Sequence, residues 1–203
     1  FYYKPRVDKE LLRQYHDGLI CLSGCYSGEL VQAILNNKDT AKAEKIINDH
    51  KEIFGQDNFF IEIGHHPTFN PQNHKKVWEA LIGLAKKTNT PLAATQDVHY
   101  LKKEDAQYHD ILLAVQTGNK LSDADRLTLK NDDFSMSSTE EMIDRFQEIP
   151  EAILNTQKIA DRCNVQLVLG KPILPHFPLP EGEASNSFLR KLVAVRTPKK
   201  FSE

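Results

Sequence analysis

The sequence of 203 residues has no hydrophobic run long enough to cross a membrane, which excludes a membrane-spanning helix. It opens without a basic segment followed by an apolar stretch, so nothing in it predicts secretion. Cysteine is also scarce: the three residues, an odd number, argue against a disulfide framework and fit a reducing compartment. We therefore expect a cytoplasmic protein that does not contact the membrane.

An excess of basic charge is absent as well. Lysine and arginine total 26 against 28 acidic residues, a net charge of −2, so no overall positive field marks the chain as a nucleic-acid binder. The sequence contains no phosphate-binding glycine loop, no GxSxG segment and no CxxC pair. What is present is an ordinary globular composition, 40% hydrophobic and 27% charged, at a length that suits one domain with or without an appendage.

The first half of the chain alternates between strand and helix patterns. Short apolar runs predict strands and amphipathic spacing predicts helices, with strands at 19–22, 59–63 and 91–95 and helices at 8–17, 40–54 and 71–87. Strands that are apolar throughout and alternate with helices are typical of parallel sheets. We therefore predict an α/β fold, a parallel sheet or barrel, with functional groups on the loops that follow the strands.

The second half follows a different pattern. Helical spacing predicts helices at 104–116, 139–149 and 150–163, a polar loop covers 118–133, and short strands are expected at 134–136 and 165–169. Four prolines then fall within nine residues, a density that excludes both a helix and a central strand. We predict an extended, proline-rich connector over 170–183.

The sharpest chemical signal is an Asp-x-His pattern, Asp97 and His99, directly after the third predicted strand. Side chains two apart on an extended segment point to the same side, and both of these can bind a divalent metal. A three-residue pattern recurs by chance, however, and a helix-capping aspartate beside a packed loop histidine is the alternative reading.

Other candidates follow the first two predicted strands. Cys25 could be a metal ligand, a nucleophile or a small buried residue, and Glu62, His65 and His66 end the second strand, with His74 on the next helix. The ends of parallel strands lie on one edge of a sheet, so these groups and the Asp-x-His pair converge. Because these groups converge, a metal site is as well supported as the alternatives. His109, in contrast, is expected on a solvated helix face.

Several long blocks together resemble the PHP (polymerase and histidinol phosphatase) domain of bacterial DNA polymerase III alpha subunits. The resemblance runs from about residue 1 to 192 and rests on FYYKPRVDKELL, DGLICLSGCYSGEL, HKEIFGQDNFFIEI, PLAATQDVHYL, HDILLAVQTG, IPEAILNTQKIADRCNV and LGKPILPHFPLPEG, in the family's order. It implies a distorted (β/α)7 barrel with a metal cluster at the carboxyl ends of the strands. By the same resemblance Cys25, Asp97 and His99 match metal ligands, and Glu62 and His66 lie on the rim of the site.

The departures from the family are informative. The N-terminal HxH motif of the family is missing, so we interpret residues 1–169 as the C-terminal portion of a PHP domain. Residues 170–183 are then the connector, and 184–203 begin the segment that leads to the polymerase core. Leu192 to Pro198 is expected to break the helix that SNSFLRKL begins, which we interpret as an aberrant end.

The resemblance implies that the parent protein performs DNA-directed DNA synthesis in replication. Its partners would be DNA, the sliding clamp, the clamp loader and a proofreading subunit, and the magnesium of its polymerase core would lie outside this chain. The PHP part would bind a divalent metal, with zinc favoured by the mixed thiolate, imidazole and carboxylate set and manganese as the alternative, and would act as a 3′–5′ exonuclease. A non-catalytic scaffold and a stand-alone PHP phosphoesterase are the alternatives. The fragment alone is expected to be inactive, because it retains too few ligands, and poorly soluble.

Overall fold

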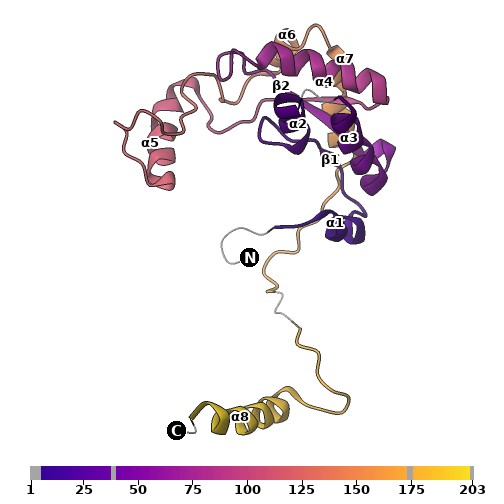
Figure 1. The fold of residues 1–203 in the computed structure, drawn as a ribbon, viewed down its shortest axis with the longest axis vertical. Helices are drawn as coiled ribbons and strands as arrows, with labels where there is room; N and C mark the ends of the chain where they lie inside the picture. Colours follow the sequence, from indigo (N-terminus) through magenta and orange to yellow (C-terminus); the bar gives the residue numbers. More distant parts are fainter. Residues whose placement is uncertain (1–5, 38–39, 173–175, 202–203) are drawn as a thin grey trace. The chain divides into compact units, whose positions relative to one another are not determined.

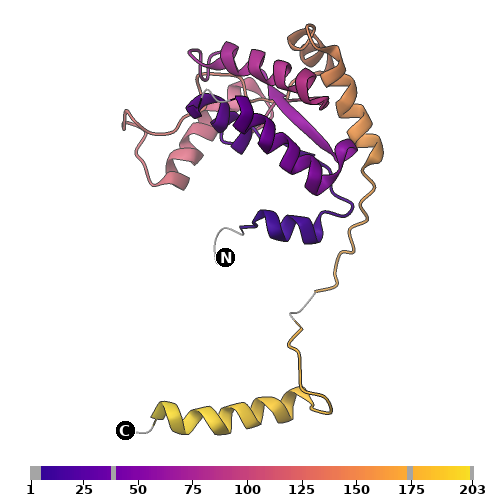
Figure 2. The same ribbon diagram turned by 45° about the vertical axis from the view of Figure 1, so that its right-hand side comes forward.

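The computed structural model describes residues 6–37, 40–172 and 176–201 (Figures 1 and 2). The chain divides into two units, Phe1–Asn164 and Val165–Glu203. The first unit is mixed α/β, as predicted, and the second contains the helix α8 (Ser185–Phe201). Across the described ranges, none of the helices combines the length and the apolar character needed to cross a bilayer.

A small parallel sheet forms the centre of the first unit. Its strands β1 (Cys21–Leu22), β2 (Phe59–Gly64) and β3 (Leu92–Thr95) lie in the order β1-β2-β3. Ile61 pairs with Leu92 and Gly64 with Thr95, so β2 and β3 end together. The parallel α/β prediction is confirmed. The described strands form an open three-stranded sheet, however, and a seven-stranded barrel is not confirmed.

Four helices belong to the first half of this unit: α1 (Lys9–Tyr15), α2 (Glu29–Asn37), α3 (Thr40–Phe54) and α4 (His74–Thr88). Asp8 caps α1, its carboxylate accepting the Leu11 N–H at 2.8 Å. The helix α2 was not predicted, because its polar start at Ser27-Gly28 reads as loop. It buries Leu30 and Val31 all the same.

The main core lies between the sheet and these helices. Every second residue of β2 points to the same side, and Phe59, Ile61 and Ile63 are almost completely buried there. Figure 2 shows β2 running between α3 and α4, whose apolar faces contribute to the same cluster. Each such side chain contributes roughly 1.5–3 kcal/mol when it is fully buried, so this cluster fixes the positions of the strand ends.

The second half of the unit contains η2 (Lys103–Asp105), α5 (Ala106–Thr117), α6 (Thr139–Arg145) and α7 (Pro150–Arg162), while η1 (Gln56–Asn58) precedes β2. The helix α6 is shorter than predicted, because Phe146 leaves the helix and is fully buried in the core. The predicted strand at 134–136 is reduced to a single bridge between Ser135 and Tyr100. The helix α7 packs beside β3, where the Asn155 amide donates to the Leu92 carbonyl at 2.8 Å.

The second unit corrects two predictions. Residues 165–169 form no strand and expose their apolar side chains by 72–84%, because no other described strand is available in this unit to pair with them. The helix α8 continues past Pro198 rather than breaking before it, and the carbonyl of Ala194 that loses its N–H partner lies on an exposed residue. The described residues of the predicted connector are neither helix nor strand; residues 173–175 lie outside the described ranges.

Candidate functional site

The predicted site residues meet at one cavity. A hollow of about 410 Å³ lies at the carboxyl ends of the three strands, and its walls include all five predicted side chains: Cys25, Glu62, His66, Asp97 and His99. His74 and His109 line it too. His109 is therefore not simply solvated, since its ring packs edge-on against His99 at a centroid distance of 5.3 Å. The structure brings the candidates to one place, as the parallel topology predicts.

The Asp-x-His pair lies on a tight loop after β3. Asp97 has a positive φ of 51°, a left-handed conformation that aspartate tolerates better than most residues. Its carbonyl oxygen lies 2.7 Å from Nδ1 of His99. A carbonyl oxygen only accepts hydrogen bonds, so Nδ1 of His99 carries the proton and Nε2 keeps its lone pair. Both side chains are more than a third exposed to solvent.

Glu62 and Cys25 occupy the neighbouring strand ends. The Thr95 hydroxyl donates to a Glu62 carboxylate oxygen at 2.8 Å, and the Glu62 N–H donates to the Ser23 hydroxyl at 3.0 Å. Glu62 therefore links the ends of all three strands. The Cys25 thiol is exposed at the mouth of the loop that leads to α2.

His66 differs from the other candidates because it is buried. It is 4% exposed, its ring stacks on Phe134 at a centroid distance of 4.2 Å, and neither ring nitrogen has a hydrogen-bond partner. Burial lowers the pKa of His66, although the carboxylates of Asp132 and Asp97 and the carbonyl of Gln96 act in the opposite direction. The ring is therefore neutral near pH 7.

The two other histidines after β2 lie differently. His65 packs edge-on against Trp78 and His74, away from the five predicted residues, so it does not join them. Nδ1 of His74 lies 3.4 Å from the Tyr26 hydroxyl at the cavity wall. Burial is the main cause that lowers the pKa of both histidines.

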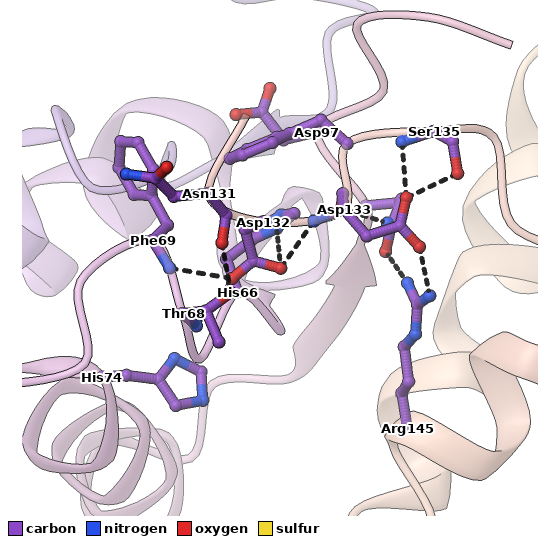
Figure 3. A network of polar contacts seen from close by, with 12 residues as sticks. His66, Thr68, Phe69, His74, Asp97, Asn131, Asp132, Asp133, Ser135 and Arg145 are labelled. Atoms are coloured by element: carbon purple, nitrogen blue, oxygen red, sulfur yellow. Dashed lines mark hydrogen bonds and ion pairs between the residues drawn. The ribbon is translucent and has the colours of Figure 1, made fainter. Parts of the chain in front are cut away.

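A polar network beside the cavity was missed by the sequence analysis (Figure 3). It centres on Asp132 and Asp133, in the long loop that precedes α6. Asp133 accepts from Ser135 and Arg145, and Arg145 also donates to the Gln96 side chain at 2.6 Å. Although burial raises it, these hydrogen bonds and the charge of Lys103 lower the pKa of Asp133 to about 2. An Asp-Asp pair in a polar loop carries no signal that distinguishes it from solvated charge.

The chemical types of the candidate side chains suit a divalent metal. Thiolate, imidazole and carboxylate are zinc ligands, and the buried nitrogens of His66 that have no partner are consistent with a ligand in the cavity. The spacing of these side chains does not match that of a metal site, however. Among the residues that the structure describes, no three His, Cys, Asp or Glu side chains come close enough to hold one metal ion. The predicted metal ligands therefore stay a prediction.

Known proteins resemble this chain over most of its length. The PHP domain family matches residues 1–66. The DNA polymerase III subunit alpha of Treponema pallidum (strain Nichols) is 42% identical over 193 residues, which cover 95% of this chain and 16% of that protein. The Thermus aquaticus subunit is 41% identical over 199 residues, with the same two shares.

The match extends to more distant relatives. The subunit of Chlamydia pneumoniae is 32% identical over 244 residues and covers 100% of this chain. The chain spans only 16–19% of the length of these curated relatives. The PHP match and the identity over nearly the whole chain show that it belongs to the family of DNA polymerase III alpha subunits, as part of the region that contains their PHP domain.

Proposed function

We propose that the chain serves DNA replication as the PHP module of a DNA polymerase III alpha subunit, an enzyme that would polymerise deoxynucleotides on a DNA template. The observation that carries this proposal is the 42% identity, over 95% of the chain, to a protein of that name. DNA would be a partner through the whole polymerase. The sliding clamp, the clamp loader and a proofreading subunit would be its protein partners, in the cytoplasm.

The described sheet is one sector of the proposed (β/α)7 barrel. Phe59 and Ile61 face the helices, which corresponds to the outer side of such a barrel. Glu62 alternates with them along β2 and lines the cavity together with Thr95 of β3, which corresponds to the inner side. The magnesium of the polymerase reaction would be bound by carboxylates elsewhere in the polymerase.

For the cavity itself we propose a metal-dependent 3′–5′ exonuclease site. Cys25, Asp97 and His99 would have to come closer together to be ligands of a zinc or manganese ion, and Glu62 and His66 would form the rim. Metal ions at such sites activate water and neutralise phosphate charge. The unprotonated Nε2 of His99 supports this role, because its Nδ1 proton is already held by the Asp97 carbonyl.

One observation favours a second function, a non-catalytic scaffold that supports the polymerase and a proofreading partner. In the part of the chain that the structure describes, no group of three potential ligands is close enough to hold a metal. A module without its metal would contribute by packing alone. The stand-alone phosphoesterase has no such support, since the relatives reported above are all polymerase subunits.

A chimera separates these functions. This chain would replace the aligned segment of the Thermus aquaticus subunit, and primer extension and bound zinc and manganese would be measured. We expect primer extension and a bound divalent metal, with metal affinity at least ~10-fold weaker after Asp97→Ala or His99→Ala. His176→Ala is the matched control, because His176 is exposed and lies outside the cavity.

Each outcome has a distinct meaning. A folded chimera that extends no primer contradicts the polymerase role. Primer extension without bound metal supports the scaffold. The 203-residue chain alone should show little or no nuclease activity, and robust metal-dependent cleavage that Asp97→Ala abolishes would contradict that expectation.

A further inference from the structure

His66 and Asp132 face each other at the wall of the cavity, although they come from loops far apart in the sequence. The side chains are 5% and 8% exposed, and Nδ1 of His66 lies 4.0 Å from Oδ1 of Asp132. Phe134 stacks on the ring at an interplanar angle of 11° and holds it in place. The two residues are thus a buried pair, of which the proposed function uses only His66, at the rim.

The Asp132 carboxylate is anchored by backbone groups (Figure 3). Its Oδ2 accepts the N–H groups of Thr68 at 2.7 Å and Phe69 at 2.8 Å, and its Oδ1 accepts the N–H of Asp133 at 2.7 Å. Although burial raises it, these hydrogen bonds keep the pKa of Asp132 below its ordinary value. A fixed, ionised carboxylate therefore stands beside an imidazole whose ring nitrogens have no hydrogen-bond partner.

We propose that Asp132 is a positioning residue for His66: its carboxylate takes the Nδ1 proton and leaves the Nε2 lone pair directed at the cavity. The role of that lone pair, binding or activating a ligand of the cavity, rests on the proposed function of the site. The hydrogen bond needs a movement of about 1 Å, from 4.0 Å to ordinary hydrogen-bond length. A carboxylate behind a histidine is a common way to fix the tautomer of a functional imidazole.

The rival arrangement puts the proton on Nε2. The Gln96 carbonyl, which acts on the pKa of His66, is the rival acceptor. A hydrogen bond to a carboxylate is roughly twice as strong as one to a neutral carbonyl, so Asp132 should win. The Nε2 edge of the ring also faces Gly64, which lines the cavity together with His66: a Cβ added at Gly64 would stand 3.8 Å from Nε2.

An amide at position 132 should reverse the tautomer. In Asp132→Asn the amide oxygen belongs at the Oδ2 position, because two backbone N–H groups point there. The NH₂ group then takes the Oδ1 position, gives up the hydrogen bond from the Asp133 N–H, and faces Nδ1 of His66. Since NH₂ only donates, Nδ1 must accept and Nε2 must carry the proton.

The test is a nitrogen-15 NMR measurement of the imidazole tautomer in the 203-residue chain, with the His66 signals assigned by their loss in His66→Gln. We expect a protonated Nδ1 and an unprotonated Nε2 in the wild type, and the opposite tautomer in Asp132→Asn. A wild-type His66 protonated at Nε2 overturns the proposal without any variant. An unchanged tautomer in a folded Asp132→Asn chain overturns it as well.

A matched control separates positioning from general support of the loops. Thr68→Val removes the 2.6 Å hydrogen bond from the Thr68 hydroxyl to the Asn131 carbonyl but keeps the Thr68 backbone N–H. It should loosen the same two loops and leave the tautomer unchanged; a reversal there would contradict the proposal. The readout needs neither metal nor nuclease activity, so failure of the proposed function would be seen separately.

Discussion

At the scale of single residues, Asp110 and Arg126 form a buried ion pair. Two guanidinium nitrogens of Arg126 donate to the two oxygens of Asp110 at 2.6 and 2.7 Å, and the side chains are 7% and 4% exposed. The Thr128 hydroxyl adds a bond at 2.6 Å, and Lys130 lies 3.4 Å away. This cluster fixes the long polar loop on α5, and α5 carries the cavity residue His109.

Replacing Arg126 should be costly at neutral pH. Arg126→Met leaves a buried carboxylate with Lys130 and Thr128 as its remaining partners, and we expect a loss of about 3 kcal/mol in the free energy of unfolding, measured in urea. The control Lys75→Met breaks an exposed pair with Glu79, 3.9 Å long, and should change stability by no more than about 0.5 kcal/mol.

The pH dependence of the same variant follows from the pKa of Asp110. The Arg126 hydrogen bonds hold the folded-state pKa of Asp110 well below its ordinary value. The stabilisation that the ionised Asp110 provides is therefore complete above the ordinary pKa and is lost only as the pH falls through the lowered one. Without Arg126 the buried carboxyl instead gains from protonation. The difference in the free energy of unfolding between Arg126→Met and the wild type should therefore become smaller from pH 7 to pH 4. A difference that stays constant would contradict this account.

The candidate residues could be predicted to different degrees. Cys25, Asp97 and His99 were identifiable because they directly follow strands, and topology alone brings strand ends together. Asp132 was not, since its partner Thr68 is 64 residues away and no local pattern links a polar loop to a strand end. The contrast is physical: backbone topology is encoded by local periodicity, whereas side-chain networks depend on tertiary packing.

At the scale of elements, a glycine marks the passage from α3 to β2. Gly55 has φ 88° and ψ 156°, a conformation that is essentially restricted to glycine. It turns the chain so that η1 and then Phe59 follow the helix directly. Gly83, in contrast, lies within α4, and a Cβ added there would meet no other atom within 4 Å.

The same substitution should have opposite effects at these two glycines. Gly55→Ala should destabilise the chain by about 1–3 kcal/mol, because alanine must adopt a disfavoured backbone conformation. Gly83→Ala should stabilise it by roughly 0.5–1 kcal/mol, because alanine loses less entropy in a helix. Urea unfolding at equal m-values measures both, and equal signs for the two variants would refute the assignment of Gly55 to a strained turn.

The bounds of helices with a clear periodic pattern in the sequence were predicted accurately. The helices α3 and α7 have clear apolar periodicity, and their observed bounds, Thr40–Phe54 and Pro150–Arg162, differ from the predicted ones by at most one residue. The prediction failed at residues 165–169, where the apolar run resembles a strand. A strand needs a neighbour for its hydrogen bonds, and local sequence does not show whether one is available.

At the scale of the whole molecule, the two units differ in how they bury apolar surface. The first contains the core around β2, with Phe59 and Ile61 fully buried. Near the start of the second, Leu167 and Leu169 are 78% and 84% exposed. The domain boundary predicted between residues 169 and 170 lies near the division after Asn164. It remains a prediction, because a division by contacts does not show independent stability.

Limited proteolysis tests that boundary. Chymotrypsin cleaves after large apolar residues in exposed segments without regular structure, so we expect early cuts after Leu167 and Leu169 and a resistant product that ends near residue 169. Mass spectrometry identifies the products. In a Leu167→Ser, Leu169→Ser double variant these early cuts should be lost, because the bond after the exposed Phe177 precedes Pro178 and resists the protease. Ile143→Ser, on the short helix α6, should leave the pattern unchanged. Early cuts within β2 or α4 would show that the first unit lacks the stability that its buried core implies.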